Sequence, residues 1–312
     1  MVDYQVLDTI FAVLSIPFIL VGVVGNSLVI HIVYSTRHMH STTNFLLVNL
    51  AVSDFLTLLL WPAHWQVWWR EKQLNGETGN FLCKTFTGVT ILDILCVVSS
   101  FTLTSLAIER YNALMKPFST NLRLSIECVK PTIAIIWFSS ILFCLPDFIL
   151  RHLDTDLNSC VGPWTMHMDN RSRIYVICNL VLTVYIPFCT LLFCYGSMIR
   201  GLYFSNTICS ESGEHNEGDT KERKQLVITF VSVTTGFFVC YVPLGSQFMY
   251  LACTKQKTEA DVYEISYQVL WFLLMATSSL NPVLYAFRST NFRNGFRRIM
   301  TFPCKVYIAE RT

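Results

Sequence analysis

Ionisable side chains are scarce inside the long apolar stretches of this 312-residue chain, so each of them points to a chemical role. Asp54 and Asp93 interrupt two such stretches, and Glu109 and Arg110 lie at the end of the second. A carboxylate in apolar surroundings is costly unless it binds a cation, a proton, water or hydrogen-bond donors. The sequence therefore predicts sites that hold an ion, a proton or a charged ligand.

Uncharged polar residues in other apolar stretches could surround Asp54. If the first, second, third and seventh stretches adjoin, Asp54 gathers Asn26, Ser99, Ser278 and Asn281 around it. Such a cluster can hold a sodium ion, a water network or a proton. A purely structural set of hydrogen bonds is the alternative, and the spacing does not choose between the two.

The remaining composition excludes most other classes of protein. The 12 Cys and 7 His show no CxxC or HExxH spacing, and no glycine-rich phosphate loop is present. A net charge of +2 argues against nucleic acid as the main partner. Apolar residues make up 53% of the chain and charged residues only 14%, whereas a soluble domain carries about 25% charged residues. These numbers exclude a soluble enzyme and predict a polytopic membrane protein, with sodium as the one candidate cofactor.

Seven charge-poor stretches are each long enough to cross a bilayer as a helix, which takes about 20 residues. Strict alternation of apolar and polar residues is absent, which excludes a β-barrel. We therefore expect an all-α membrane protein, a seven-transmembrane helix bundle within residues 1–300. The expected spans are 9–35, 43–69, 83–112, 127–149, 173–203, 222–252 and 262–287.

A short amphipathic helix is expected after the seventh span, at about 290–300, followed by a cytoplasmic tail over 301–312. Its pattern of arginine and phenylalanine is typical of a helix that lies at the membrane surface. Cys304 follows it and is a candidate for palmitoylation, with an ordinary cytosolic thiol as the alternative.

The distribution of basic residues predicts the orientation. Most of the 23 Lys and Arg lie in the loops that share a side with the C-terminus, which marks that side as cytoplasmic. The N-terminus is then extracellular, and Cys83 and Cys160 lie on the outer side, where disulfides are stable. Cys253 also lies near that side, and its partner is unclear. Asn170-Arg171-Ser172 is a glycosylation sequon there, although this tripeptide is common by chance.

Several short motifs occur in a fixed order along the spans. They are GNSLV at 25–29, NLAVSD at 49–54, Glu109-Arg110-Tyr111, Trp137, Pro187 with Tyr195, FFVCYVP at 237–243, and Asn281-Pro282-Val283-Leu284-Tyr285 followed by Phe292. In this order and spacing the chain resembles the rhodopsin-like (class A) G-protein-coupled receptors, and among them the peptide-receptor type, along essentially its whole length. The resemblance implies a non-enzymatic plasma-membrane receptor that binds an extracellular ligand and activates a heterotrimeric G protein.

The resemblance also implies roles for individual residues. Arg110 would be held by Glu109 at rest and would form the floor of the G-protein cavity after activation, supported by Tyr195 and Tyr285. An inert hydrogen-bonded network at the helix ends is the alternative. The expected switch residues are Glu109, Arg110, Tyr111, Tyr195, Asn281, Pro282 and Tyr285, and the expected transmission residues are Phe237, Tyr241 and Pro243.

Three positions depart from the family pattern. Tyr241 stands where the family usually has tryptophan, and Arg223 stands where many members have an acid that pairs with the arginine of span three. Cys83 lies 27 residues before Arg110 instead of the usual 25, which suggests a bulge or a shifted helix start. By the resemblance, Cys83 and Cys160 form the disulfide.

The ligand is less well defined by the sequence. The acid of amine receptors would fall at Leu92, whereas Asp93 is one residue later, about 100° around the helix. Pro62, the long loop over 151–173 and an acidic outer rim favour a cationic peptide. The rim consists of Asp147, Asp154, Asp156, Glu259, Asp261 and Glu264. A small amine-like molecule is the first alternative, a constitutively active relative the second, and a membrane transporter a remote one.

Offsets from the motifs define a candidate ligand pocket that is mostly aromatic, as ligand sites tend to be. Asp93 is the hypothetical counter-charge of the ligand in this pocket. The pocket residues are His64, Trp68, Asp93, Cys96, Asn179, Tyr241, Phe248, Tyr267 and Trp271.

Overall fold

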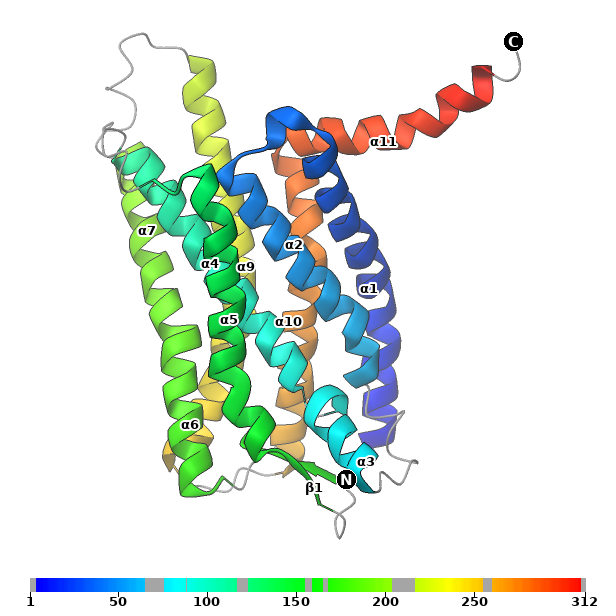
Figure 1. Cartoon of the computed structure of the whole chain (residues 1–312), viewed down its shortest axis with the longest axis vertical. Coiled ribbons are helices and arrows are strands. Elements are labelled where there is room, and N and C mark those ends of the chain that lie inside the picture. The colour runs from blue at the N-terminus through cyan, green and yellow to red at the C-terminus, as the bar shows by residue number, and fades with distance from the viewer. Residues whose placement is uncertain are drawn as a thin grey trace.

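A computed structural model of the chain contains a bundle of long helices that run side by side (Figure 1). It describes residues 4–64, 76–87, 89–116, 123–154, 159–164, 168–203, 217–254 and 260–309. Seven helical segments in these ranges are long and apolar enough to cross a membrane. The prediction of an all-α, seven-helix membrane bundle is therefore confirmed.

The long helices follow one another along the chain. They are α1 (Tyr4–Ser35), α2 (Thr42–Leu60), α4 (Thr90–Met115), α5 (Ile126–Leu150), α6 (Asn170–Leu180) with α7 (Ile186–Tyr203), α9 (Glu217–Thr254) and α10 (Ala260–Arg288). The π-helical turn η6 (Val181–Tyr185) joins α6 to α7 into one span. The shorter helical elements are η1 (Arg37–Met39), η2 (Trp61–His64), α3 (Gly76–Leu82), the π-helical turn η4 (Cys83–Thr87) and α11 (Thr290–Ala309).

Polar side chains define where three of these helices begin. Ser41 caps α2, Ser125 caps α5 and Asp169 caps α6, each by accepting a hydrogen bond from a backbone N–H in the first turn. These side chains satisfy N–H groups that have no partner within the helix. The two hydrogen bonds that the Asp169 carboxylate accepts at Ser172 lower the pKa of this exposed group below its ordinary value.

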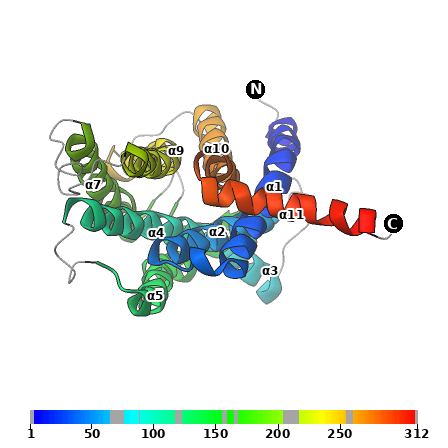
Figure 2. The same cartoon turned by 90° about the horizontal axis from the view of Figure 1, so that it is seen from above.

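The two ends of the bundle differ in structure. At one end, β1 (His152–Asp154) and β2 (Ser159–Val161) form an antiparallel hairpin; we call this the hairpin end. At the other end, α11 lies across the bundle, as Figure 2 shows; we call this the α11 end. Helix α11 continues to Ala309, beyond the range expected from the sequence, because the amphipathic pattern gives no signal for its end.

The irregularity expected before span three is present. The π-helical turn η4 begins at Cys83, and Val89 adopts a left-handed backbone conformation with φ of 60° just before α4. A residue with a side chain rarely adopts this conformation, so it marks a true break in the helix. The two extra residues between Cys83 and Arg110 therefore form a bulge and a restarted helix, as predicted.

Polar side chains connect the helices inside the bundle. The Asn49 side chain donates to Thr102 Oγ1 at 2.7 Å, and its Oδ1 accepts from Trp137 Nε1 at 2.9 Å. These bonds join α2 to α4 and α5. Hydrogen bonds of this kind hold membrane helices together where the hydrophobic effect between helices is weak.

Two glycines allow α1 to lie close against the rest of the bundle. A Cβ placed on Gly22 would lie 2.3 Å from Leu58 Cδ1 and 3.0 Å from the Cα of Ser279. A Cβ on Gly25 would lie 2.8 Å from Pro282 Cβ. Small residues at such contacts let helix backbones approach, which is a main source of packing energy in membranes.

We expect Gly22→Ala to destabilise the protein by about 1–3 kcal/mol, the usual cost of overpacking a close contact. The added methyl group would meet the backbone of Ser279, which cannot move independently of α10. The midpoint of thermal unfolding of the purified protein in detergent measures the effect.

Gly196→Ala is the matched control, because a Cβ on Gly196 in α7 meets no atom within 4 Å. Alanine is the better helix former by up to about 1 kcal/mol, so this variant should unfold at the same temperature or slightly higher. Equal unfolding midpoints for Gly22→Ala and Gly196→Ala would contradict the close packing of α1.

Candidate functional site

A cavity in the hairpin-end half of the bundle is the candidate ligand site. It lies between α4, α5, α6, α9 and α10, and its volume of about 500 Å³ includes open solvent at the mouth. Its lining combines one carboxyl group, one amide and five aromatic rings with aliphatic side chains. The lining residues are Val89, Asp93, Val97, Cys144, Trp164, Asn179, Leu180, Tyr241, Leu244, Gly245, Phe248, Tyr267 and Trp271.

The structure brings together six of the nine residues that the sequence assigned to the pocket: Asp93, Asn179, Tyr241, Phe248, Tyr267 and Trp271. Cys96 is buried in α4 and is not among the lining residues. Trp68 and the side chain of His64 lie outside the part of the chain that is described.

The lining also contains residues that the sequence analysis missed. Leu244 and Gly245 follow Tyr241 by three and four positions, and Val97 follows Asp93 by four, so helical periodicity could have found them. Trp164 comes from the segment after β2, and no helical spacing relates it to the other lining residues. It contacts Phe248 edge to face, with ring centroids 5.1 Å apart.

Aromatic rings form a continuous wall on the α9 and α10 side of the cavity. Phe248 and Tyr267 pack edge to face at 6.2 Å, and Tyr267 packs against Trp271 at 6.3 Å. Edge-to-face pairs of this kind stabilise the packing beyond the area they bury. The wall therefore presents fixed ring faces and edges to a ligand.

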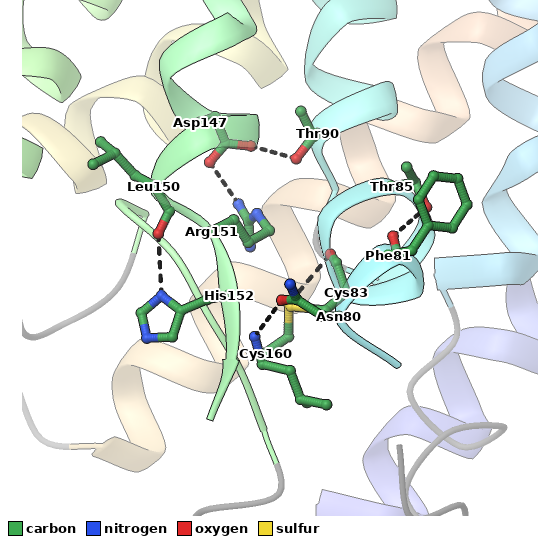
Figure 3. Close-up of a disulfide and its surroundings, with 11 residues drawn as sticks. Asn80, Phe81, Cys83, Thr85, Thr90, Asp147, Leu150, Arg151, His152 and Cys160 are labelled. Atoms are coloured by element: carbon green, nitrogen blue, oxygen red, sulfur yellow. Dashed lines mark hydrogen bonds and ion pairs between the residues drawn. A yellow bond between two sulfur atoms is a disulfide. The ribbon is translucent and has the colours of Figure 1, made fainter. Parts of the chain in front are cut away.

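A buried ion pair lies beside the cavity. Arg151 Nη2 and Asp147 Oδ1 are 2.8 Å apart, and the side chains are 6% and 0% exposed. Thr90 Oγ1 donates to the second carboxylate oxygen of Asp147 at 2.5 Å (Figure 3). The sequence placed Asp147 on an exposed acidic rim, and this was wrong: the residue lies one helical turn before Arg151, and both turn inward.

The hairpin is fixed to this ion pair and to the helices around it. The disulfide joins Cys160 of β2 to Cys83 at the start of η4, which confirms the predicted pairing. Leu153 N in β1 donates to Asn80 Oδ1 at 3.1 Å (Figure 3). A Cβ on Gly162 would lie 2.8 Å from Arg151 Cζ, so only glycine fits against the guanidinium. Cys253, for which the sequence offered no partner, is an exposed free cysteine.

An arginine near the start of α6 joins this helix to the end of α9. Arg173 Nη1 donates to the carbonyl oxygens of Leu251 and Ala252 at 3.3 and 2.9 Å, and its Nε donates to Met168 O at 3.0 Å. A cation at the C-terminus of a helix is favourable, because the last carbonyl groups have no partner within the helix. This contact fixes the hairpin ends of two helices that line the cavity.

The polar cluster around Asp54 lies in the middle of the bundle. Asn281 Nδ2 donates to Asp54 Oδ2 at 2.7 Å, and Ser278 is close enough to hydrogen-bond the same carboxyl group. Asn26 Nδ2 donates to Ser278 O at 3.0 Å. Ser99 is paired with Ser53 at 2.9 Å, a partner that the sequence analysis missed. Among the described residues, no group of three or more His, Cys, Asp and Glu could hold a metal ion.

The charged pair at the end of α4 lies at the α11 end. Glu109 Oε2 accepts from Arg110 Nε at 2.6 Å and from Thr43 Oγ1 of α2 at 3.2 Å. The Glu109 carboxylate, which binds Arg110, is therefore also bonded to α2. Arg223 lies in α9, but its side chain is outside the described part of the chain.

The two tyrosines expected to support Arg110 have other partners here. The Tyr195 hydroxyl pairs with Thr234 Oγ1 at 2.9 Å, which joins α7 to α9. Tyr285 is buried and stacks on Phe292 of α11 with centroids 5.5 Å apart.

Phe237 packs edge to face against Tyr241, with ring centroids 5.0 Å apart. These two transmission residues are therefore in contact on the α11 side of the cavity. Pro243, the third transmission residue, lies in α9 two residues beyond Tyr241 and six beyond Phe237, towards the hairpin end.

Comparison with known proteins identifies similarity along nearly the whole chain. Residues 25–285 match the family described as 7 transmembrane receptor (rhodopsin family). The chain is 26% identical over 302 residues to the tachykinin-like peptides receptor 99D of Drosophila melanogaster, covering 94% of this chain and 57% of that receptor. It is 28% identical over 296 residues to the neuropeptide FF receptor 2 of Mus musculus, covering 88% and 68%.

A third relative is the RYamide receptor of Tribolium castaneum, 25% identical over 317 residues that cover 96% of this chain and 82% of the receptor. The chain spans less than two thirds of the length of the two Drosophila receptors it matches, 57% and 59%.

Proposed function

Because the chain belongs to the rhodopsin family of seven-transmembrane receptors, we propose that it binds an extracellular peptide in the cavity and thereby activates a heterotrimeric G protein. The family consists of receptors rather than enzymes. The names of the fly and beetle relatives specify peptide ligands, tachykinin-like peptides and RYamides. The observation that carries the proposal is the cavity, which joins a carboxyl group to an aromatic wall at the hairpin end.

In the proposed orientation, the hairpin end faces the outside of the plasma membrane and the α11 end faces the cytoplasm. The basic loops support this orientation, because positive charge accumulates on the cytoplasmic side of membrane proteins. The disulfide between Cys83 and Cys160 then lies in the oxidising compartment, where such bonds persist. The N-terminus is extracellular and the C-terminus cytoplasmic.

Helix α9 would carry the signal from the cavity to the cytoplasm. A ligand in the cavity contacts Tyr241, which packs on Phe237 towards the α11 end. Pro243 lies within α9 and lacks a backbone N–H, so the helix can bend there and move as two rigid parts. A ligand that binds the displaced arrangement more tightly shifts the population toward it. Release of Arg110 from Glu109 would then open the G-protein site, with Tyr111, Asn281, Pro282 and Tyr285 repacking around it.

The cluster around Asp54 would hold a sodium ion or a water network between the two sites. Its carboxylate accepts a hydrogen bond from Asn281 at 2.7 Å and lies within hydrogen-bond reach of Ser278. Asn26 bonds to Ser278, and Ser99 bonds to Ser53, one residue before Asp54. An oxygen-rich set of this kind suits a hard cation. The cluster joins α1, α2, α4 and α10, so a bound ion would oppose their rearrangement.

Two modifications belong to the same proposal. The side chain of Asn170 is exposed at the start of α6, at the hairpin end, where a glycan could be attached. Cys304 lies within α11, and a palmitoyl chain there would hold this helix at the membrane surface.

The test is guanine-nucleotide exchange on G proteins in membranes from cells that express the chain, challenged with a peptide-rich tissue extract. We expect the extract to stimulate exchange, protease treatment of the extract to abolish the response, and Arg110→Ala to lower it at least about tenfold. A tenfold loss corresponds to a contribution of Arg110 of about 1.4 kcal/mol to the coupled state.

Arg37→Ala is the control, because it removes the same charge from an exposed position of η1 at the same end. A response that survives protease would point to a small-molecule ligand and contradict the peptide. A response of normal size in Arg110→Ala would contradict the proposed coupling site.

A further inference from the structure

Asp93 and Asp8 each have a buried Oδ2 with no hydrogen-bond partner among the described residues. Asp8 Oδ1 accepts from Gln268 Nε2 at 2.6 Å, whereas the Asp93 side chain has no donor among the described residues. Asp54 accepts a hydrogen bond from the side chain of Asn281. Asp147 forms an ion pair with Arg151 and accepts a hydrogen bond from Thr90. An acid in apolar surroundings without donors is unfavourable, so its retention calls for a partner that the resting protein does not supply.

The nearest guanidinium is held away from Asp93. Arg151 is fixed by Asp147 at 2.8 Å and lies against Gly162, where even a methyl group would not fit. Asp93 is close enough to Asp147 and to Arg151 to interact with both electrostatically. Arg151 is therefore the cation that attracts both carboxyl groups. Two carboxyl groups therefore share one positive charge, and none of the described lining residues is basic. The site is complementary to one added cation.

The surroundings of Asp93 favour a flat cation over a compact one. Tyr241, Phe248, Tyr267 and Trp271 line the same cavity, and the last three form a wall of edge-to-face rings. A guanidinium stacks on aromatic faces, is weakly hydrated and pairs with a carboxylate through two parallel hydrogen bonds. An ammonium is more strongly hydrated and loses more on entering such a site.

The amide in the lining does not compete for this role. Asn179 Nδ2 donates to Phe143 O at 3.0 Å, and Asn179 Oδ1 accepts from Thr183 Oγ1 at 3.2 Å. Its donor and acceptor are therefore both engaged within the bundle. Asp93 is left as the polar anchor for a group that enters from the hairpin end.

We infer that the ligand inserts a guanidinium, the side chain of an arginine, between the aromatic wall and Asp93, and that Asp93 sets the specificity for it. This inference rests on the proposed function, because it names the chemical class of the peptide that the cavity receives. Asp147 does not bind the ligand. It holds Arg151, which would otherwise neutralise Asp93.

The probes are pools of synthetic hexapeptides, acetylated and amidated at their ends, with neutral residues at all positions but one. The fixed residue is arginine, lysine or citrulline, which has the shape of arginine without its charge. The readouts are thermal stabilisation of the purified receptor in lipid nanodiscs and nucleotide exchange on G protein. For the wild type, we expect the half-maximal concentration of the arginine pools to be at least about tenfold lower than that of the citrulline pools, with lysine between them.

Asp93→Asn should remove the preference for arginine, and Asp93→Glu should keep most of it. Asp154→Asn is the matched control, since it removes the same charge from β1 at the hairpin end. An unfolding midpoint for ligand-free Asp93→Asn like that of the wild type shows that the variant is folded. If it is not folded, the arginine and citrulline pools on the wild type still test the guanidinium, and a larger loss of the arginine preference in Asp93→Glu than in Asp154→Asn still assigns it to position 93.

The inference is overturned if arginine and citrulline pools act equally on the wild type, if the preference persists in Asp93→Asn, or if no pool stabilises the protein. Lysine pools that act as strongly as arginine pools would overturn the assignment of a guanidinium. Stabilisation with the arginine preference but without nucleotide exchange would contradict the proposed receptor function and support the binding site. Activation by the extract that protease abolishes, without any preference for arginine pools, would support the proposed receptor function and overturn the guanidinium site.

Discussion

Asp147→Asn is expected to destabilise the protein by about 3–5 kcal/mol, the cost of leaving one member of a buried ion pair without its partner. Arg151 is 6% exposed, so its guanidinium would be left buried without its carboxylate partner. An asparagine side chain has a single acceptor oxygen, so it cannot accept from both Arg151 and Thr90 as the carboxylate does. The thermal unfolding midpoint in detergent, and the fraction of protein that reaches the cell surface, should both fall.

The double variant Asp147→Leu with Arg151→Met tests the cause. Replacing both members of a buried ion pair with apolar residues of similar size is often neutral, so the double variant should be much more stable than Asp147→Asn. Asp154→Asn, at a partly exposed position of β1, should change the midpoint little. A double variant as unstable as the single one would mean that packing, not charge, determines the loss.

The same ion pair illustrates what the sequence could not predict. Asp147 and Arg151 are four residues apart, a spacing that brings side chains together on any helix, exposed or buried. Their burial depends on Gly162, which comes from the hairpin and lets the backbone lie against the guanidinium. Contacts between distant segments of this kind leave no periodic pattern in the chain. An acidic residue near a helix end was therefore interpreted as part of a solvated rim.

The bundle itself could be predicted because its signals are local. A membrane-crossing helix requires about 20 apolar residues in a row, and seven such stretches can be found without knowledge of any contact. The interior partners of Asp54 and Asn281 followed from family motifs that occur in a fixed order. The bulge before α4 followed from a count of residues, but the left-handed conformation of Val89 did not, because valine disfavours it.

The cavity could be predicted from the sequence only in part. Residues on one face of α9, such as Tyr241 and Phe248, could be placed by helical spacing from Pro243. Trp164 could not, because its position depends on the disulfide and on the hairpin that carries it. The sequence thus predicted the helical walls of the site and missed the part that comes from a loop.

Thr234→Val is expected to raise basal nucleotide exchange by about fivefold, if the receptor function proposed above is correct. The Tyr195 hydroxyl and Thr234 Oγ1 form a buried hydrogen bond 2.9 Å long between α7 and α9. Valine keeps the shape of threonine and removes its hydroxyl, so about 1 kcal/mol of the resting arrangement is lost. A shift of 1 kcal/mol changes a two-state population ratio about fivefold. Nucleotide exchange in ligand-free membranes measures it.

Two variants separate this cause from general damage to α9. Ser232→Ala removes a hydroxyl from the same helix that bonds only within it, to Ile228 O at 2.8 Å, and should leave basal exchange unchanged. Tyr195→Phe breaks the same contact as Thr234→Val, but it also removes the hydroxyl proposed to support Arg110 after activation. Basal exchange should therefore rise while the maximal response falls. If Thr234→Val leaves basal exchange at the wild-type level and the maximal response is normal, this hydrogen bond does not stabilise the resting state.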